Sequence, residues 1–374
     1  MLTFNKKILF ILHVPPPIHG ASMVGSYIQE SKLINENFKT RYISLGTTKN
    51  FKERKKTSIT KIFRYFKLLH TSLHTIFTFK PDLIYISLTA QGIGFYKDAL
   101  VVLLAKILDG KMLYHFHNKG VKTRQHNPFD NWLYKKVFKD ADVVLLSEYL
   151  YTDIEKYISR EHVHVCPNGI PDQISIVNKQ LVKRTNKPVK LLFLSNLIES
   201  KGVYVLIEAC DILKQKGLSF TCVLVGGVGD ITTHQLNKKI SESNLEKEVM
   251  YLGKKYGLEK ESAFAASDIF VFPTYYPNEC FPLVLLEAMQ SKLPIISTPE
   301  GGISSIVNNG KNGYLVPQKD LKTLANRLEE LIRNPKKRKE MGENGRKKYE
   351  QEFKIDQFEK RITNILEEVM YKNE

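Results

Sequence analysis

Residues 269–289 read IFVFPTYYPNECFPLVLLEAM and contain the parts of one structural unit. The apolar run from Ile269 to Pro273 has the length and composition of a short buried strand. A polar loop follows. Pro282 then suits the first turn of a helix, because its missing N–H would have no partner there. A buried strand that leads through a loop into a helix is typical of a parallel α/β sheet, so this segment predicts an α/β fold.

The same alternation of short apolar runs and helical segments extends along the chain. The remaining runs are Lys7–Val14, Leu83–Ser87, Met112–His117, Asp142–Ser147, Leu191–Leu194, Thr221–Val225, Val249–Leu252 and Pro294–Thr298. Their apolar character is continuous, which indicates strands covered by helices on both faces of a sheet. We therefore expect two Rossmann-like domains, each with a doubly wound parallel sheet.

The length of 374 residues also favours two domains, at about 150 residues each. Periodicity fades between Pro167 and Pro188, where Asn, Pro, Gln and Lys accumulate. This places one domain at residues 1–170 and the other at 171–354. Apolar residues recur at helical spacing from Ile355 to Val369, so we expect residues 355–374 to form a closing helix that packs back on the first domain.

The composition is that of an ordinary globular protein, with 43% hydrophobic, 10% aromatic and 25% charged residues. The four cysteines form no C-x-x-C pair, so neither a disulfide framework nor a zinc site is indicated, and a cytoplasmic location is expected. The N-terminal apolar run resembles a signal peptide but ends at His13 and Pro15, which favours a first strand. No run approaches the ~18 apolar residues of a membrane span.

Positive charge is concentrated in the first half of the chain. The sequence has 56 Lys and Arg against 39 Asp and Glu, a net charge of +17, of which residues 1–170 contribute +12. Such a surface attracts nucleic acid, a phosphorylated ligand or an acidic membrane. No helix-turn-helix, zinc-finger or RNA-binding sheet signature accompanies the charge, so we do not expect nucleic acid as the partner.

Residues 56–79 predict an amphipathic helix. Lys56, Arg64 and Lys67 lie opposite an apolar arc made of Ile59, Ile62, Phe63, Phe66, Leu69, Leu73, Ile76 and Phe77. One interpretation is a helix that covers the core with a solvated basic back. The other adds membrane contact, because Lys49–Lys67 holds eight basic residues and one acid, and each basic residue contributes ~1 kcal/mol near an anionic leaflet. Both can hold if the apolar arc packs inward.

The helix that begins near Pro282 predicts an anion site. The backbone amides from Phe281 to Val284 lie at its positive end, where a diphosphate binds readily. Glu279 precedes this end, and Glu287 lies about one and a half turns inside it. Such a layout suits a ligand with a central phosphate and hydroxylated groups on both sides, as in a nucleotide-sugar. Taken alone, a pair of glutamates at this spacing more often consists of exposed helical side chains.

The pattern Glu279-x7-Glu287 resembles the signature of the retaining glycosyltransferases of family 4, which have the GT-B fold. The resemblance covers nearly the whole chain. The other similar segments, in order, are Pro15–Ala21, Lys80–Tyr85, Ala141–Glu148, Val165–Ile170, Phe193–Val203, Val225–Gly229, Pro299–Val307 and Asn309–Val316.

The resemblance implies a role for each matching residue at the donor. Glu287 would bind the ribose hydroxyls and Glu279 the donor sugar. The amides at Phe281, Leu283 and Gly20 would approach the diphosphate and the sugar.

The resemblance also implies two cations, of which one is missing. Lys201 would neutralise the diphosphate and stabilise the leaving group. Asn196 stands where the family usually has arginine. Either Lys201 works alone, or a basic residue of the first domain substitutes.

His117 ends a predicted strand at its carboxyl edge, where open α/β sheets bind ligands. It resembles the family's active-site histidine, and with Lys201 and Glu279 it completes the expected catalytic set. His115 lies on the same side of the strand and is the second candidate. No metal site is expected, because Asp140-x-Asp142 imitates a metal motif but introduces a buried strand without companion ligands.

The resemblance implies sugar transfer from a nucleotide-sugar, with a UDP-sugar favoured, to a hydroxyl with retained configuration and without a cofactor. The second domain would bind the donor and the basic first domain the acceptor, with the reaction in the cleft between them. The charge asymmetry points to a lipid-linked saccharide as acceptor, at the inner face of an anionic membrane, in surface polysaccharide assembly such as lipopolysaccharide or capsule. A sugar-nucleotide epimerase of the same fold and a non-catalytic binding module are the alternatives.

Overall fold

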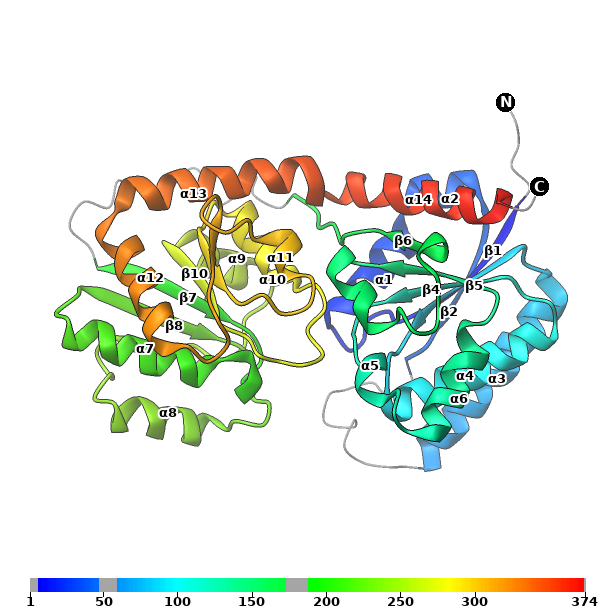
Figure 1. Ribbon diagram of the computed structural model, residues 1–374, viewed down its shortest axis with the longest axis horizontal. Helices are drawn as coiled ribbons and strands as arrows, with labels where there is room; N and C mark the ends of the chain where they lie inside the picture. Colours follow the sequence, from blue (N-terminus) through cyan, green and yellow to red (C-terminus); the bar gives the residue numbers. More distant parts are fainter. Residues whose placement is uncertain (1–5, 47–58, 173–187, 373–374) are drawn as a thin grey trace. The chain divides into compact units, whose positions relative to one another are not determined.

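The computed structural model describes residues 6–46, 59–172 and 188–372 (Figure 1). The chain forms two compact units. The first comprises Met1–Gly169 together with Ile355–Glu374, and the second comprises Ile170–Lys354. Most of the predicted linker between Pro167 and Pro188 lies outside the described residues, as does the basic stretch from Lys49 to Ser58.

The first unit contains a parallel sheet of six strands in the order β2-β1-β3-β4-β5-β6. The strands are β1 (Lys7–Leu12), β2 (Lys39–Ser44), β3 (Leu83–Leu88), β4 (Met112–Phe116), β5 (Ala141–Leu145) and β6 (Val163–Val165). The α-helices are α1 (Gly20–Glu30), α2 (Lys32–Asn37), α3 (Ile59–Phe79), α4 (Gly92–Ile107), α5 (Val121–Arg124), α6 (Pro128–Phe138) and α14 (Ile355–Tyr371). Figure 1 shows α3, α4 and α6 side by side, and α2 lies beside α14.

The second unit contains another parallel sheet of six strands, in the order β12-β11-β10-β7-β8-β9. The strands are β7 (Val189–Leu194), β8 (Phe220–Val225), β9 (Val249–Tyr251), β10 (Ile269–Phe272), β11 (Ile295–Ser297) and β12 (Gly313–Leu315). The α-helices are α7 (Val203–Gln215), α8 (Thr233–Glu242), α9 (Gly257–Ala265), α10 (Leu283–Gln290), α11 (Ile303–Ile306), α12 (Leu321–Arg333) and α13 (Pro335–Lys348).

The buried strands confirm the predicted fold class. Every residue of β3, β4, β5 and β10 is buried, as expected for strands covered by helices on both faces. Two Rossmann-like, doubly wound parallel sheets are therefore present. In the second sheet, the strands that follow β7 in the chain begin on one side of it and continue on the other. The topological switch point lies between β7 and β10, where such sheets bind their ligands.

The orientation predicted for the apolar arc of α3 is wrong. Leu69 and Ile76 are buried, but Ile59, Phe63 and Phe77 are 85%, 73% and 72% exposed. The helix has 21 residues and is about 31 Å long, whereas the six-residue strand β3 spans about 20 Å. The helix is therefore longer than the strand, and the sheet cannot cover all of its turns. None of the described helices combines the length and the apolar character that a membrane span requires.

Candidate functional site

The predicted donor residues follow the two strands that flank the switch point of the second sheet. Asn196 and Lys201 come after β7, and Glu279 comes after β10 in the loop that leads to α10. The carboxyl ends of parallel strands meet at one edge of a sheet, so segments far apart in sequence converge there. His117 and Gly20 lie in the first unit.

Lys201 and Glu279 form an ion pair in a largely buried environment. Their side chains are 14% and 9% exposed. The Lys201 ammonium also lies 5.5 Å from the ring centre of Phe272 and 4.4 Å from that of Tyr276, within the range of cation–π attraction. The structure thus holds a cation and a carboxylate at the carboxyl end of β10.

Two glycines of the quoted motifs hold the loop that carries Glu279. Gly202 has φ +87°, and a Cβ on it would lie 2.2 Å from the carbonyl oxygen of Pro273. Gly301 has φ +57°, and a Cβ on it would lie 2.2 Å from the carbonyl oxygen of Glu279 itself. Any other residue would push the loop away, so both glycines act on the geometry of the site through backbone contact.

The N-terminus of α10 has no side-chain cap. Pro282 is the N-cap and helical geometry begins at Leu283, one residue later than the sequence predicted. Phe281 is buried and Leu283 is half-buried. The first amides of a helix have no intrahelical partner, and proline offers no side-chain acceptor, so this positive end suits an anion.

Glu287 lies farther along α10 and is bound by one cation. Lys260 of α9 forms an ion pair with its Oε1, while its Oε2 is buried and has no hydrogen-bond partner in the described part of the chain. Burial raises the pKa of the Glu287 carboxyl, and the nearby Lys260 opposes that rise. One carboxylate oxygen therefore remains to accept a hydrogen bond from a hydroxyl group of a ligand.

Asn196 lies beside a lysine of the same unit. A Cβ on Gly227 would lie 3.2 Å from Asn196 Oδ1 and 3.5 Å from Lys254 Cδ, so the two side chains run close together over this glycine. The Lys254 ammonium is 4.6 Å from the ring centre of Tyr256. The sequence offered only the first domain as a source of a substitute cation. The structure places a candidate in the second unit, 58 positions from Asn196.

His117 directly follows β4 and belongs to a group of histidines in the first unit. Its ring centre is 4.1 Å from that of His115, whose Nδ1 is hydrogen-bonded to the hydroxyl of Tyr85. Neither ring nitrogen of His117 has a hydrogen-bond partner among the described residues. Burial, followed by the neighbouring His115, His13 and His19, holds its pKa well below the usual 6.5. The imidazole is thus neutral and has a free acceptor nitrogen.

Gly20 is the first residue of α1 and is exposed. A Cβ on it would meet no atom within 4 Å, whereas a Cβ on Gly25 would lie 1.9 Å from the carbonyl oxygen of His13. The packing of α1 against the end of β1 therefore requires glycine at position 25. It does not require glycine at position 20. His19 caps the same helix, with Nδ1 accepting from the backbone N–H of Ser22 at 3.3 Å.

Sequence reasoning did not select His13 and His19 as site residues. Their ring centres are 5.9 Å apart. Their positions in the sequence could have indicated a role: His13 directly follows the first strand, and His19 directly precedes Gly20.

Residues 176–348 match the family described as "Glycosyl transferases group 1". The chain carries a glycosyltransferase group 1 domain. The amylovoran biosynthesis glycosyltransferase AmsK of Erwinia amylovora is 30% identical over 227 residues, which is 59% of this chain and 54% of that protein. The putative colanic acid biosynthesis glycosyltransferase WcaL of Salmonella typhimurium is 28% identical over 231 residues, 61% of this chain and 56% of that protein. The chain thus spans about half the length of the curated relatives it matches.

Solved structures confirm the GT-B fold for both units. A glycosyltransferase from Rickettsia africae superposes with a TM-score of 0.77 at 19% identity and covers 99% of this chain and 100% of that one. HepE of Anabaena in complex with UDP-glucose gives a TM-score of 0.71 at 21% identity, over 97% and 100% of the two chains.

Proposed function

We propose that this protein is a retaining glycosyltransferase of family 4 that transfers a sugar from a UDP-sugar to a hydroxyl group. The observation that carries the proposal is the buried Lys201–Glu279 pair at the switch point of the group 1 domain, next to the uncapped N-terminus of α10. The structure of HepE with UDP-glucose supports the choice of donor.

The donor would extend along the first turns of α10. Its diphosphate would accept hydrogen bonds from the amides at Phe281 and Leu283 and would lie near the Lys201 ammonium. The free oxygen of Glu287 would accept from the ribose hydroxyls, and Glu279 from the sugar hydroxyls. Each group thus serves a different part of one ligand.

Lys254 would supply the second cation of the diphosphate site in place of the arginine that Asn196 replaces. Its side chain lies beside Asn196 over Gly227 and is exposed at the surface, so its ammonium can reach a ligand there. Two lysines and a helix N-terminus together would balance the charge that develops on the departing UDP, without a metal ion.

His117 would act on the donor sugar as a neutral imidazole. Its low pKa keeps an acceptor nitrogen available at neutral pH, and Gly20 would let the backbone of α1 approach the ligand closely. No side chain is assigned as a covalent nucleophile. We therefore propose attack on the same face of the sugar from which UDP departs, with a phosphate oxygen taking the proton of the acceptor hydroxyl.

The acceptor would be a lipid-linked saccharide at the inner face of an anionic membrane. The net charge of +12 on residues 1–170 supports an anionic partner for the first unit. The relatives named for amylovoran and colanic acid biosynthesis support a role in surface polysaccharide assembly.

The test is a donor screen of the purified protein with UDP-, GDP- and ADP-sugars, by thermal shift and by release of the nucleotide. We expect a UDP-sugar to stabilise the protein, and nuclear magnetic resonance of the transfer product to show the anomeric configuration of the donor. Activity should persist in EDTA. Turnover of the sugar-nucleotide without any acceptor would indicate an epimerase. Complementation by a variant lacking both Glu279 and His117 would indicate a binding module.

A further inference from the structure

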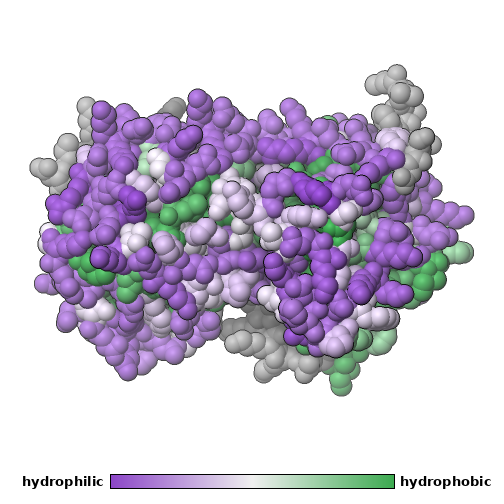
Figure 2. Space-filling model, viewed as in Figure 1, coloured by the Kyte–Doolittle hydropathy of each residue, from purple (hydrophilic) through white to green (hydrophobic). Residues whose placement is uncertain are grey.

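Helix α3 exposes large apolar side chains that the first unit does not cover. Ile62, Phe63 and Phe66 are 57%, 73% and 63% exposed, and Ile59 and Phe77 extend the row toward both ends of the helix. Figure 2 shows hydrophobic residues along the edge of the first unit at which α3 lies. Single exposed apolar residues are normal in proteins, but a row of them along one helix marks an interaction site.

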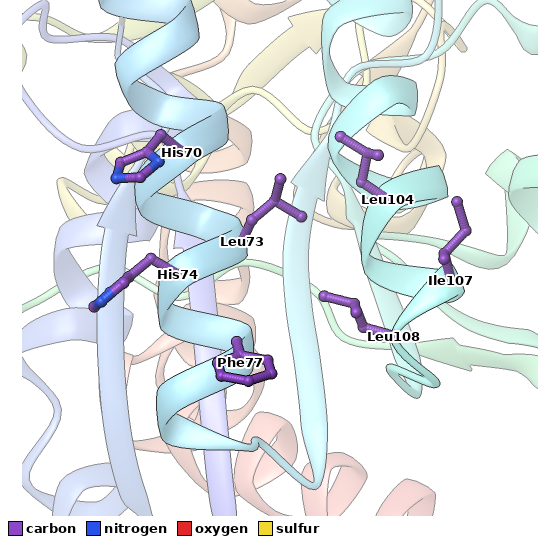
Figure 3. Close-up of a pocket in the computed structure, with 7 residues that line it drawn as sticks. All are labelled: His70, Leu73, His74, Phe77, Leu104, Ile107 and Leu108. Carbon is purple, nitrogen blue, oxygen red and sulfur yellow. The ribbon is translucent and has the colours of Figure 1, made fainter.

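An apolar hollow of about 430 Å³ continues this row between α3 and α4 (Figure 3). Leu73 of α3 points toward α4, where Leu104, Ile107 and Leu108 complete the wall. Ile107 is 76% exposed, so the hollow opens at the surface. Its walls are almost entirely hydrocarbon, with two histidines of α3 at its margin.

Aromatic contacts carry the same surface across α4 to α6. The Tyr65 hydroxyl donates to the carbonyl oxygen of Lys97 at 2.8 Å, and the neighbouring Tyr96 ring is 5.8 Å from Phe129. Phe129 in turn stacks on Trp132 at 6.0 Å, and both are more than half exposed. We call the exposed apolar and aromatic side chains of these three helices, with the hollow, the α3–α4–α6 surface.

The charged side chains within these three helices are mostly basic. The described helices α3, α4 and α6 contain two acids, Asp98 and Asp130, and both are buried. Their basic residues are Lys61, Arg64, Lys67, Lys97, Lys106, Lys135 and Lys136. Of these, Lys67, Lys135 and Lys136 are exposed. Exposed apolar and aromatic side chains beside such lysines match an anionic bilayer, whose phosphates attract the cations while its interior accepts the rings.

We propose that the α3–α4–α6 surface docks on an anionic phospholipid bilayer, with Phe63 and Phe66 inserted below the headgroups and an acyl chain in the hollow. This reverses the orientation predicted from the sequence, in which the apolar arc packs inward. This inference deepens the proposed function, and it rests on that function only where it identifies the biological membrane. Binding of the surface to an anionic lipid bilayer does not depend on the proposed function.

The test is flotation of the full chain with vesicles of phosphatidylcholine alone or mixed with phosphatidylglycerol. We expect recovery with the mixed vesicles at low salt, and weaker recovery in roughly 0.5 M NaCl because salt screens the lysines. The variant F63S/F66S should bind more than about tenfold more weakly, since it loses two inserted rings. Neutralising Lys67 or Lys135 should cost about fivefold each.

Trp132 provides an independent readout, because it is the single tryptophan of the chain. Its fluorescence should shift to shorter wavelength when mixed vesicles are added. The matched control is M250S/L258S, which removes two side chains of the second unit that are 59% and 63% exposed. This variant should bind vesicles like the wild type.

Equal binding of F63S/F66S and wild type, or no binding of wild type to the mixed vesicles, would overturn the proposal. So would a dimer in vesicle-free ultracentrifugation that F63S/F66S converts to monomer, because the occupant would then be a second copy of the chain. Nucleotide release with a water-soluble acceptor is measured in parallel. A variant that loses vesicle binding but still releases nucleotide shows that the docking surface is separate from the donor site. The docking proposal and the proposed function can then be judged independently.

Discussion

Replacing Lys201 by methionine should separate its structural role from its proposed role at the donor. The substitution leaves the Glu279 carboxylate without its cation at a position where the side chain is 9% exposed. Removal of one partner from a buried ion pair costs about 3–5 kcal/mol. For a domain of this size, each kcal/mol lowers Tm by about 2–4 °C, so a loss of ~3 kcal/mol corresponds to a fall of roughly 6–12 °C.

The double variant K201M/E279Q should recover most of that stability. It removes both charges and keeps side chains of similar volume, so the free energy of unfolding should return to within about 1 kcal/mol of the wild type. Binding of UDP should not recover, because the cation next to the diphosphate is still missing. A hydrogen bond to a charged group contributes ~1.5–3 kcal/mol, which predicts a 10- to 150-fold weaker affinity.

Thermal denaturation and titration calorimetry with UDP measure the two effects on the same samples. Lys238 pairs with Glu242 on the exposed face of α8, and K238M should change neither Tm nor UDP affinity appreciably. If K201M/E279Q binds UDP as tightly as the wild type, Lys201 serves the ion pair alone and the donor assignment is wrong.

Three further outcomes test the other parts of the site. G20A should leave Tm unchanged and lower sugar transfer, whereas G25A should lower Tm by several degrees because its Cβ meets a backbone carbonyl. The pKa of His115 is lowered to about 3 and that of His117 well below 6.5, so the unfolded chain binds protons first and stability falls as pH drops below ~6.5. Denaturant unfolding at several pH values measures how the free energy of unfolding changes with pH. In H117N this dependence should be smaller by ~1.4 kcal/mol per pH unit, because one histidine no longer binds a proton on unfolding. K254M should weaken UDP binding about tenfold in calorimetry with no change in Tm, and equal affinity would leave Lys201 as the single cation.

The sequence predicted the strands inside the sheets and the edge strand β9, and missed the edge strands β2, β6 and β12. Inner strands such as β3 and β10 are continuous apolar runs, because helices cover both faces. The edge strand β2 reads KTRYIS and is largely exposed or half-buried, so its composition is that of a loop. The three-residue edge strand β12 is too short to carry a pattern.

The orientation of α3 illustrates what periodicity leaves undetermined. A period of 3.6 residues shows that one side of a helix is apolar, and says nothing about what covers that side. The face on the sheet is set by Leu69, Ser72 and Ile76, while the larger Phe63 and Phe66 project outward.

The proposed donor residues Glu279 and Glu287 were selected from a continuous motif, whereas the lysines beside the proposed site were not. Glu279 and Glu287 lie eight positions apart on one loop and helix, so their spacing is visible in the sequence. Lys260 beside Glu287 and Lys254 beside Asn196 come from other segments, brought near by the order of the strands. No local pattern marks such a pair.

The first unit is built from both ends of the chain, and this has a consequence during protein synthesis. Its last helix, α14, buries Phe358, Ile362 and Leu366 and lies beside α2, yet the ribosome makes all of Ile170–Lys354 in between. At about 5–20 residues per second that interval lasts roughly 10–40 s. The first unit is therefore completed only after α14 has been made, whereas the second unit can already fold. A premature stop before Ile355 would therefore remove α14 from the first unit and leave the second unit intact.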